Sequence, residues 1–318
     1  MTADHDTVEA GLRERLARCD GVSASMIPVL RHLVRADDRG AALSDETVAR
    51  VRGMIAHLAR ELLGSPGADA GAADETELAA ALMDDPALLL HVQALALEAQ
   101  LAQRLQSTLA IDPVLPPLLQ AVIADADEAR AGPGMRLLAA QARFMQAQRR
   151  MEIGLTELPG ELLHRALLTM RTVVGTDGEP GERVATTARR ISAEYDAGAS
   201  RLGLAARLVR ALDGDAAMAL SLADAGVTIF LTALSLACGQ EREAATLATG
   251  EGPAIRLGLM LRASGLTPAL VEQQLLALHP EGGLPDNKLS GALERVSPDT
   301  AAAILMDAAR IGAAHPDR

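Results

Sequence analysis

Residues 44–64 read SDETVARVRGMIAHLARELLG, and this stretch decides the fold class. Its apolar residues recur every three or four positions, at Val48, Val51, Ile55, Leu58 and Leu62. That period places them on one face of an α-helix. A serine precedes the pattern and Gly64 ends it, as is common at the two ends of a helix. The stretch therefore predicts one amphipathic helix.

The same helical period recurs along the rest of the chain. Val8, Leu12 and Leu16 predict a first helix, and the apolar positions from Ile27 to Val34 predict a second. No stretch alternates β-branched and polar residues, and no Asn-Gly turn occurs, so no strand is predicted. The start and stop signals together predict roughly fourteen to seventeen helices, mostly of 10–20 residues.

Helix starts and stops are marked by residues with a clear physical role. Four dipeptides place a capping side chain before proline: Asp85-Pro86, Asp112-Pro113, Thr267-Pro268 and Ser297-Pro298. Asp74 and Glu77 have the spacing of a capping box. Five glycines are predicted stops: Gly64, Gly198, Gly226, Gly239 and Gly265.

Aromatic residues are scarce: Phe144, Tyr195 and Phe230 are the only three in 318 positions, although 49% of the chain is hydrophobic. The core must therefore be built from aliphatic stripes on closely packed helices. With so few rings, a stacking platform for nucleic-acid bases is not expected.

The length of 318 residues predicts more than one module or one extended array. Two polar linkers, 64–73 and 175–181, divide the chain into an N-terminal helical unit (1–64), a middle block (74–174) and a C-terminal block (182–318). We expect an all-α fold of stacked antiparallel helix pairs. Either an irregular HEAT-like α-solenoid or two helical bundles fits the pattern, and the last two blocks can form one continuous array.

The chain has no features of a secreted or membrane protein. Its most apolar run, 227–238, is too short to cross a bilayer, and its first nine residues carry no lysine or arginine. Cys19 and Cys238 form no CxxC motif, which fits a reducing compartment. A cytoplasmic location is the expectation.

No catalytic motif is present, and we expect no enzyme activity, cofactor or metal. His57, followed by Arg60 and Glu61 on an amphipathic helix, resembles the phospho-accepting helices of two-component signalling, but the tighter motif of that family is absent and an ordinary surface histidine is the favoured interpretation. Glu161 and His164 share a helical face, yet a di-iron bundle needs a second such pair and none occurs. An enzyme or phosphorelay component using a helix-borne histidine remains the first alternative.

Positive charge is concentrated in the middle of an acidic chain. The net charge is −12, but residues 130–210 hold 13 arginines and 8 acidic residues. The candidate face for an acidic protein partner comprises Arg143, Arg149, Arg150, Arg189, Arg190, Arg207 and Arg210, with Arg183 and Arg201 in the same cluster. These arginines can equally pair with neighbouring acids. Nucleic-acid binding through this region is the second alternative, which the net charge disfavours.

Several stretches resemble a family of uncharacterised alphaproteobacterial proteins that share the domain of unknown function DUF2336. They are IDPVLPPLLQAVIA (111–124), AAQARFMQAQRRME (139–152), ELPGELLH (157–164), LVRALDGD (208–215) and LRASGL (261–266). The resemblance covers most of residues 44–278. It implies an all-helical, HEAT-like cytosolic protein and carries over no activity, cofactor or site residue.

These observations together predict a non-catalytic, regulatory or scaffolding protein that binds another protein. Stacked helix pairs expose an extended surface suited to that role. Neither the identity of the partner nor the oligomeric state follows from the sequence.

Overall fold

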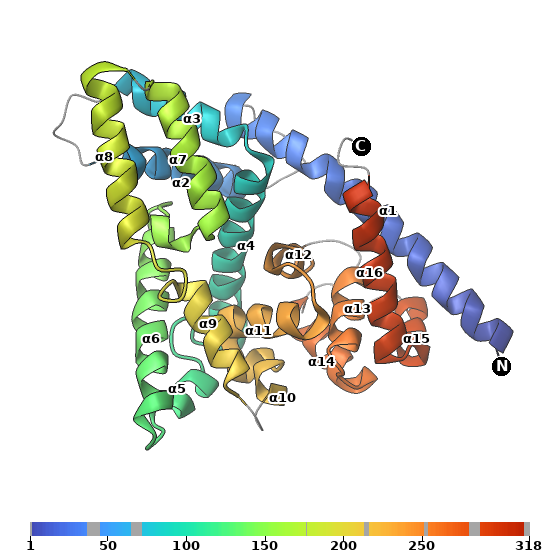
Figure 1. Ribbon diagram of the computed structural model, residues 1–318. Coiled ribbons are helices and arrows are strands. Elements are labelled where there is room, and N and C mark those ends of the chain that lie inside the picture. The colour runs from blue at the N-terminus through green and yellow to red at the C-terminus, as the bar shows by residue number, and fades with distance from the viewer. Residues whose placement is uncertain are drawn as a thin grey trace. The chain divides into compact units, whose positions relative to one another are not determined.

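The computed structural model describes residues 2–36, 45–64, 72–175, 177–212, 216–250, 254–279 and 287–314. Within these ranges the chain forms seventeen helices, one of them a short 3₁₀-helix, and no β-strand (Figure 1). The all-α fold class and the predicted number of helices are confirmed.

The helices run in the order α1 (Thr2–Ala36), α2 (Asp45–Leu63), α3 (Ala72–Met83), α4 (Pro86–Leu109), α5 (Pro117–Ile123), α6 (Glu128–Arg149), η1 (Leu155–Glu157), α7 (Gly160–Val174), α8 (Gly178–Glu194), α9 (Arg201–Arg210), α10 (Ala216–Ala219), α11 (Leu222–Cys238), α12 (Arg242–Leu247), α13 (Ile255–Ala263), α14 (Pro268–Leu278), α15 (Asn287–Arg295) and α16 (Pro298–Ala314).

Two compact units can be distinguished, and each is assembled from separated segments. Unit 1 comprises Met1–Met26, Leu101–Ala121 and Val209–Arg318, and unit 2 comprises Ile27–Gln100 and Val122–Leu208. The units therefore cut across the three consecutive blocks predicted from the sequence, because helices distant along the chain pack together.

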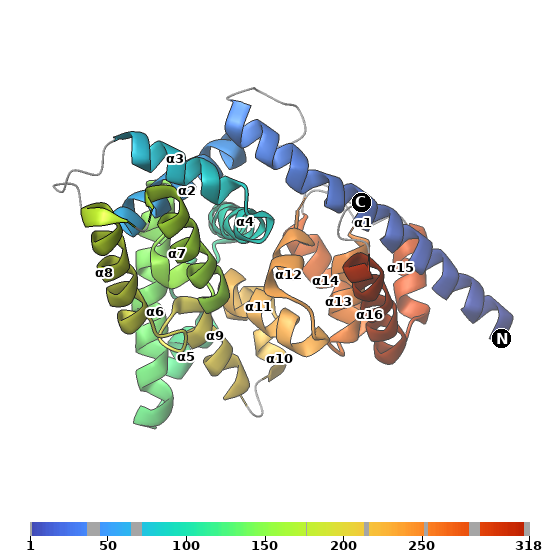
Figure 2. The same cartoon turned by 45° about the horizontal axis from the view of Figure 1, so that its top comes forward.

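Unit 2 contains a group of four helices in which α2 packs on α3, α7 and α8, and α7 packs on α3 and α8 (Figures 1 and 2). The predicted apolar stripe of α2 points into this group, and Val51, Ile55, Leu58 and Leu62 are all fully buried. Each such side chain contributes about 1.5–3 kcal/mol by leaving water. The stretch that predicted the fold class is thus part of the core.

Unit 1 is organised around α13, on which α11, α14, α15 and α16 pack. All residues of α13 except Arg256 and Ala263 are buried, and Gly258 lets α15 approach closely. A Cβ added at Gly258 would lie 2.6 Å from Cδ1 of Leu293. The scarcity of aromatic side chains predicts close helix packing through small residues. Gly258 is an example of such packing.

Three of the four predicted cap-proline starts are confirmed. The carboxylate of Asp85 accepts hydrogen bonds from two amides in the first turn of α4, at 3.0 and 3.2 Å. Thr267 and Ser297 each accept one amide at the start of α14 and α16, at 3.4 and 3.1 Å. In each case the next residue is the proline that begins the helix.

Asp112 also caps two amides, at 2.7 and 3.0 Å, but no helix begins at Pro113. The next helix, α5, begins at Pro117. In a helix that starts at Pro113, the amide of residue 117 would donate to the carbonyl of Pro113. Residue 117 is itself a proline, which has no amide hydrogen to donate. The prediction of a helix start at Asp112-Pro113 is therefore wrong.

Other predicted boundaries also shift. The two helices predicted near Val8 and Ile27 form one continuous helix, α1. Asp74 lies inside the first turn of α3, which begins at Ala72, so it is not the cap of a capping box. Residues 178–181, predicted as part of a loop, form the first turn of α8.

The predicted glycine stops are confirmed at three helix ends. Gly64, Gly239 and Gly265 follow α2, α11 and α13 with φ of 88°, 63° and 88°. This left-handed backbone is readily adopted by glycine, which has no Cβ. Gly198 lies in the turn between α8 and α9.

Among the described residues, no single helix combines the length and apolarity needed to cross a membrane. Residues 74–83 and α4 meet that test only as a pair, and the chain bends by 91° between them.

Gly226 marks a break within α11 rather than its end. Its φ of 65° and ψ of 176° interrupt the helical backbone. An added Cβ would also lie 3.0 Å from the Cβ of Pro116. The kink of α11 therefore needs glycine for two independent reasons.

We predict that Gly226→Ala lowers the free energy of unfolding by about 1–3 kcal/mol, because it adds backbone strain and a steric contact. Gly291→Ala is the matched control: it lies within α15, and no atom lies within 4 Å of its added Cβ. This control should be neutral or stabilising by up to about 1 kcal/mol. Urea denaturation followed by circular dichroism distinguishes the two, and equal effects would contradict the assignment.

Candidate functional site

Several side-chain hydrogen bonds hold the stretch of unit 2 that runs from the last residues of α6 toward α7. We call residues 148–158 the clamped segment. Side chains of α2 hold its first half: Arg50 Nη1 donates to the carbonyl of Gln148 at 2.8 Å, and His57 Nδ1 bonds to the carbonyl of Ile153 at 2.8 Å. The carboxylate of Glu61 accepts the amide of Leu155 at 2.9 Å.

The clamping residues recur along α2 with the helical period. Arg50, Gly53, His57 and Glu61 are three or four positions apart, so they share one face. Gly53 lies so close to Met151 that an added Cβ would be 2.8 Å from the methionine Cβ. This face of α2 therefore contacts the clamped segment from Gln148 to Leu155.

Two further side chains hold the second half of the clamped segment. Nε2 of the buried His91 bonds to the carbonyl of Glu157 at 2.9 Å, and the hydroxyl of Tyr195 donates to the carbonyl of Leu158 at 2.8 Å. A carbonyl can only accept, so Nε2 of His91 carries the proton. Burial raises the pKa of Tyr195, which favours the protonated form that makes this bond.

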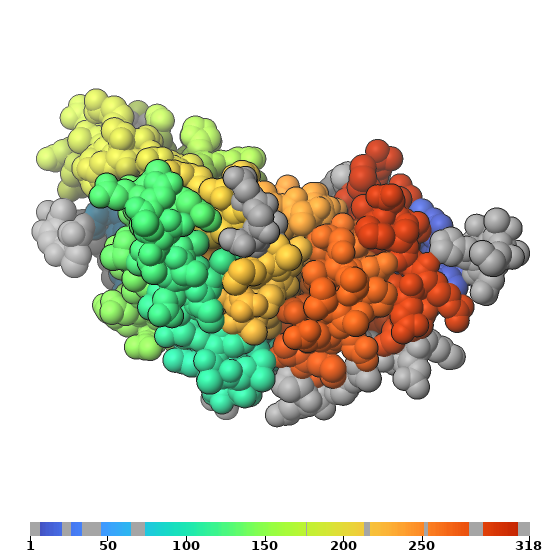
Figure 3. All heavy atoms as spheres, turned by 90° about the horizontal axis from the view of Figure 1, so that it is seen from below, coloured from blue at the N-terminus to red at the C-terminus, as the bar shows by residue number. Residues whose placement is uncertain are grey.

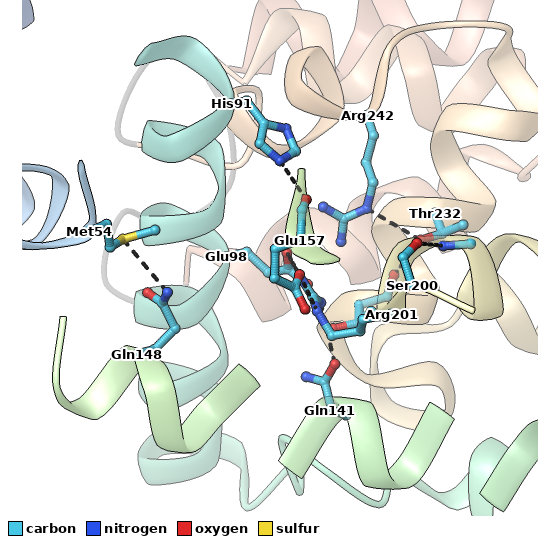
Figure 4. A network of polar contacts seen from close by, with 12 residues as sticks. Met54, His91, Glu98, Gln141, Gln148, Glu157, Ser200, Arg201, Thr232 and Arg242 are labelled. Atoms are coloured by element: carbon cyan, nitrogen blue, oxygen red, sulfur yellow. Dashed lines mark hydrogen bonds and ion pairs between the residues drawn. The ribbon is translucent and has the colours of Figure 1, made fainter. Parts of the chain in front are cut away.

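Arg201 lies at the centre of a buried polar cluster (Figure 4). Its Nη1 donates to Glu98 at 2.8 Å and its Nε donates to Glu157 at 2.9 Å. A weaker bond of 3.3 Å joins Nη1 to the side-chain oxygen of Gln141. The guanidinium also stacks on Phe144, with its carbon 3.7 Å from the ring centroid. Together these side chains define the Arg201 cluster.

The carboxylates keep Arg201 charged despite its burial. Desolvation alone would lower the pKa of Arg201, but the attraction of Glu157 and Glu98 and their hydrogen bonds raise it. Four elements meet here, because Glu98 is on α4, Phe144 on α6, Glu157 on η1 and Arg201 on α9. The cluster therefore joins helices that the sequence places far apart.

On the side of α6 away from the cluster, arginines are exposed. Arg136, Arg143, Arg149 and the adjoining Arg150 are exposed, and no acidic residue occurs between Arg130 and Glu152. We call these four residues the α6 arginine stripe. Arg150 lies 3.8 Å from Glu152, whereas the other three have no ion pair or hydrogen bond within the described chain. The segment that carries the stripe, drawn in green, reaches the molecular surface in Figure 3.

Arg136 is not among the candidate arginines that the sequence predicts. Its spacing of seven residues from Arg143, and of fourteen from Arg150, could have identified it, since residues seven apart lie close to one helical face.

The other candidate arginines are also exposed, but several of them already have partners within the protein. Arg190 pairs with Glu194 at 3.0 Å. Arg189 bonds within its own helix, and Arg207 is 3.4 Å from the carbonyl of Gly198. Arg210 belongs to unit 1, whereas the stripe belongs to unit 2.

Arg201 corrects the sequence interpretation. It was grouped with the basic face, yet only 1% of it is exposed, and its charge is directed at Glu98 and Glu157. An arginine in a basic stretch was predicted to face solvent or a surface acid. Tertiary contacts instead bury it.

The two candidate histidines differ in their surroundings. His57 is half-buried, and its Nδ1 must carry the proton because its partner is a carbonyl. His164 is exposed on α7. Phosphate acceptance by His57 remains a prediction.

Metal-ligating side chains do not gather in the described residues: no group of three or more His, Cys, Asp or Glu is placed to hold an ion.

Both cysteines are free, and burial raises the pKa of the Cys238 thiol to about 11. A thiol with that pKa is almost entirely protonated at neutral pH, which makes it a poor nucleophile.

Comparisons of the chain with protein-family models, curated proteins and solved structures gave no match. The resemblance to the DUF2336 family therefore stays a prediction.

We predict that Arg201→Met lowers the free energy of unfolding by about 3–5 kcal/mol, because it leaves two buried carboxylates without their cation. Urea denaturation measures the loss. Arg207→Met, an exposed change on the same helix, should cost no more than about 0.5 kcal/mol.

Adding Glu98→Gln to Arg201→Met should recover part of that loss, because it removes one of the uncompensated charges. If Arg201→Met proved no more costly than Arg207→Met, the Arg201 cluster would not organise unit 2.

We predict that His57→Ala lowers the free energy of unfolding by about 1–3 kcal/mol, because the buried carbonyl of Ile153 loses its donor. His57→Gln keeps a donor and should lose less. Thermal unfolding of these variants is compared with that of His164→Ala, which should stay within about 0.5 kcal/mol of wild type. Similar losses for His57→Ala and His164→Ala would count against the clamp.

Proposed function

We propose that the protein is a non-catalytic interaction module that binds an acidic segment of a partner protein through the α6 arginine stripe. The observation that supports this most directly is the exposure of Arg136 and Arg143 without any partner among the described residues. A run of positive charge on a net acidic chain favours a partner of opposite sign.

The position of the stripe supports a role beyond helix stability. Arginines near the C-terminus of a helix are stabilised by the helix dipole, which accounts for Arg149 and Arg150. That effect is confined to the last turn. Arg136 and Arg143 lie in earlier turns, so the dipole does not account for them.

The inner face of α6 is fixed, which favours binding. Leu137, Gln141, Phe144 and Gln148 are buried, and two of them belong to the Arg201 cluster. A rigid helix presents its outer side chains with little loss of backbone entropy on binding. The Arg201 cluster and the clamped segment therefore act as the support of the stripe.

The aromatic side chains of unit 2 favour a protein partner over a nucleic acid. Phe144 is buried beneath Arg201, and Tyr195 is bonded to Leu158. The buried ring of Phe144 is therefore closed to base stacking, on which single-strand binding commonly depends.

The test is binding of a fluorescent ten-residue polyglutamate peptide at low salt, measured by anisotropy. Arg136→Gln/Arg143→Gln should weaken binding roughly 5- to 30-fold, since each exposed pair contributes about 0.5–1 kcal/mol. Arg171→Gln/Arg183→Gln, which removes the same charge from exposed positions on α7 and α8, is the matched control and should change little.

Equal losses in the two double variants, or no binding of any acidic peptide at low salt, would contradict the proposal. A DNA duplex is titrated in parallel. Tighter binding to the duplex, with a steep dependence on salt, would assign the stripe to nucleic acid instead.

A further inference from the structure

The geometry of the α6 arginine stripe restricts the form of its partner. Arg136, Arg143 and Arg150 are spaced by seven residues, which is about 10.5 Å along a helix that rises 1.5 Å per residue. Over each such interval the direction of the side chain drifts by only about 20°. The Cα atoms of Arg136, Arg143 and Arg150, the last at the C-cap of α6, thus lie near one line about 21 Å long.

The surface beside this line suits close approach of another helix. Met135, Ala139 and Gln146 are exposed and Ala142 is half-buried, and they follow one another at intervals of three or four residues. Met135, at 51% exposure, is the most prominent apolar side chain on α6. Small residues between larger ones let two helix axes come within about 8–10 Å.

An extended segment fits the three arginines poorly. Side chains of a strand return to the same face every second residue, so they are spaced by about 6.8 Å or 13.6 Å. Neither spacing matches about 10.5 Å. A helix with a carboxylate at every seventh residue matches it directly, because both partners then have the same rise.

We infer that the acidic partner segment is an α-helix with Asp or Glu at seven-residue intervals over at least three positions, packed alongside α6. This inference rests on the proposed function, since it specifies the conformation of the acidic segment. The carboxylates of the partner helix face Arg136, Arg143 and Arg150. The apolar side chains of the partner helix cover Met135 and Ala139.

The experiment compares two 21-residue, alanine-rich helical peptides, each with three glutamates and the same composition. In one peptide the glutamates are seven residues apart, and in the other they are five apart and point to different faces. Circular dichroism confirms that both peptides are helical. Binding to the full chain is measured by fluorescence anisotropy at low salt.

The peptide with seven-residue spacing should bind about 10-fold more tightly, because only it engages Arg136, Arg143 and Arg150 at once. Arg143→Gln should remove most of that difference, whereas Arg171→Gln should preserve it. Circular dichroism of both variants shows that they remain folded.

If the two helical peptides bind with equal affinity and polyglutamate also binds, the helical inference is overturned and the proposed function stands. A third peptide, with seven-residue spacing but interrupted by proline, should bind weakly, and tight binding by it would also overturn the inference. If no acidic peptide binds, both proposals fail.

Discussion

The buried ion pairs of Arg201 are the constraint on which unit 2 depends. A guanidinium placed in the core must have every donor satisfied, because an unpaired buried charge costs several kcal/mol. Glu98 and Glu157 meet that need from α4 and η1, and Phe144 covers the face of the group. A shift of any one of these elements would break contacts made by the others. The ion pairs therefore fix how α4, α6, η1 and α9 come together.

Unit 1 uses a buried arginine in a different way. Arg262 donates to the carbonyls of Leu266, Leu293 and Val296, and no carboxylate takes part in these bonds. Burial lowers the pKa of Arg262. The backbone groups it satisfies lie after α13 and around the end of α15, where helix ends leave carbonyls without partners. In both units an arginine thus satisfies polar groups that an aliphatic core cannot.

In unit 2 these contacts give α6 two faces with distinct roles. The inner face contributes Gln141 and Phe144 to the Arg201 cluster, and Gln148 accepts a bond from Arg50 of α2. The outer face holds the α6 arginine stripe. The proposed binding surface is thus built on a helix whose inner face is held by the Arg201 cluster and by Arg50 of α2.

The sequence alone determined the local structure. Apolar residues at intervals of three or four specify a helix wherever they occur, and caps such as Asp85 act within one turn, so both can be recognised without tertiary information. The wrong helix start at Asp112 also has a local cause, because the later prolines, which are visible in the sequence, decided where the helix could begin. Exposure of arginines was decided only by the tertiary structure. Arg143 and Arg201 belong to the same basic stretch, yet one is exposed and the other meets carboxylates 103 and 44 residues away. The charge of each residue can be read directly from the sequence. Its burial cannot, because burial depends on which distant helices pack together.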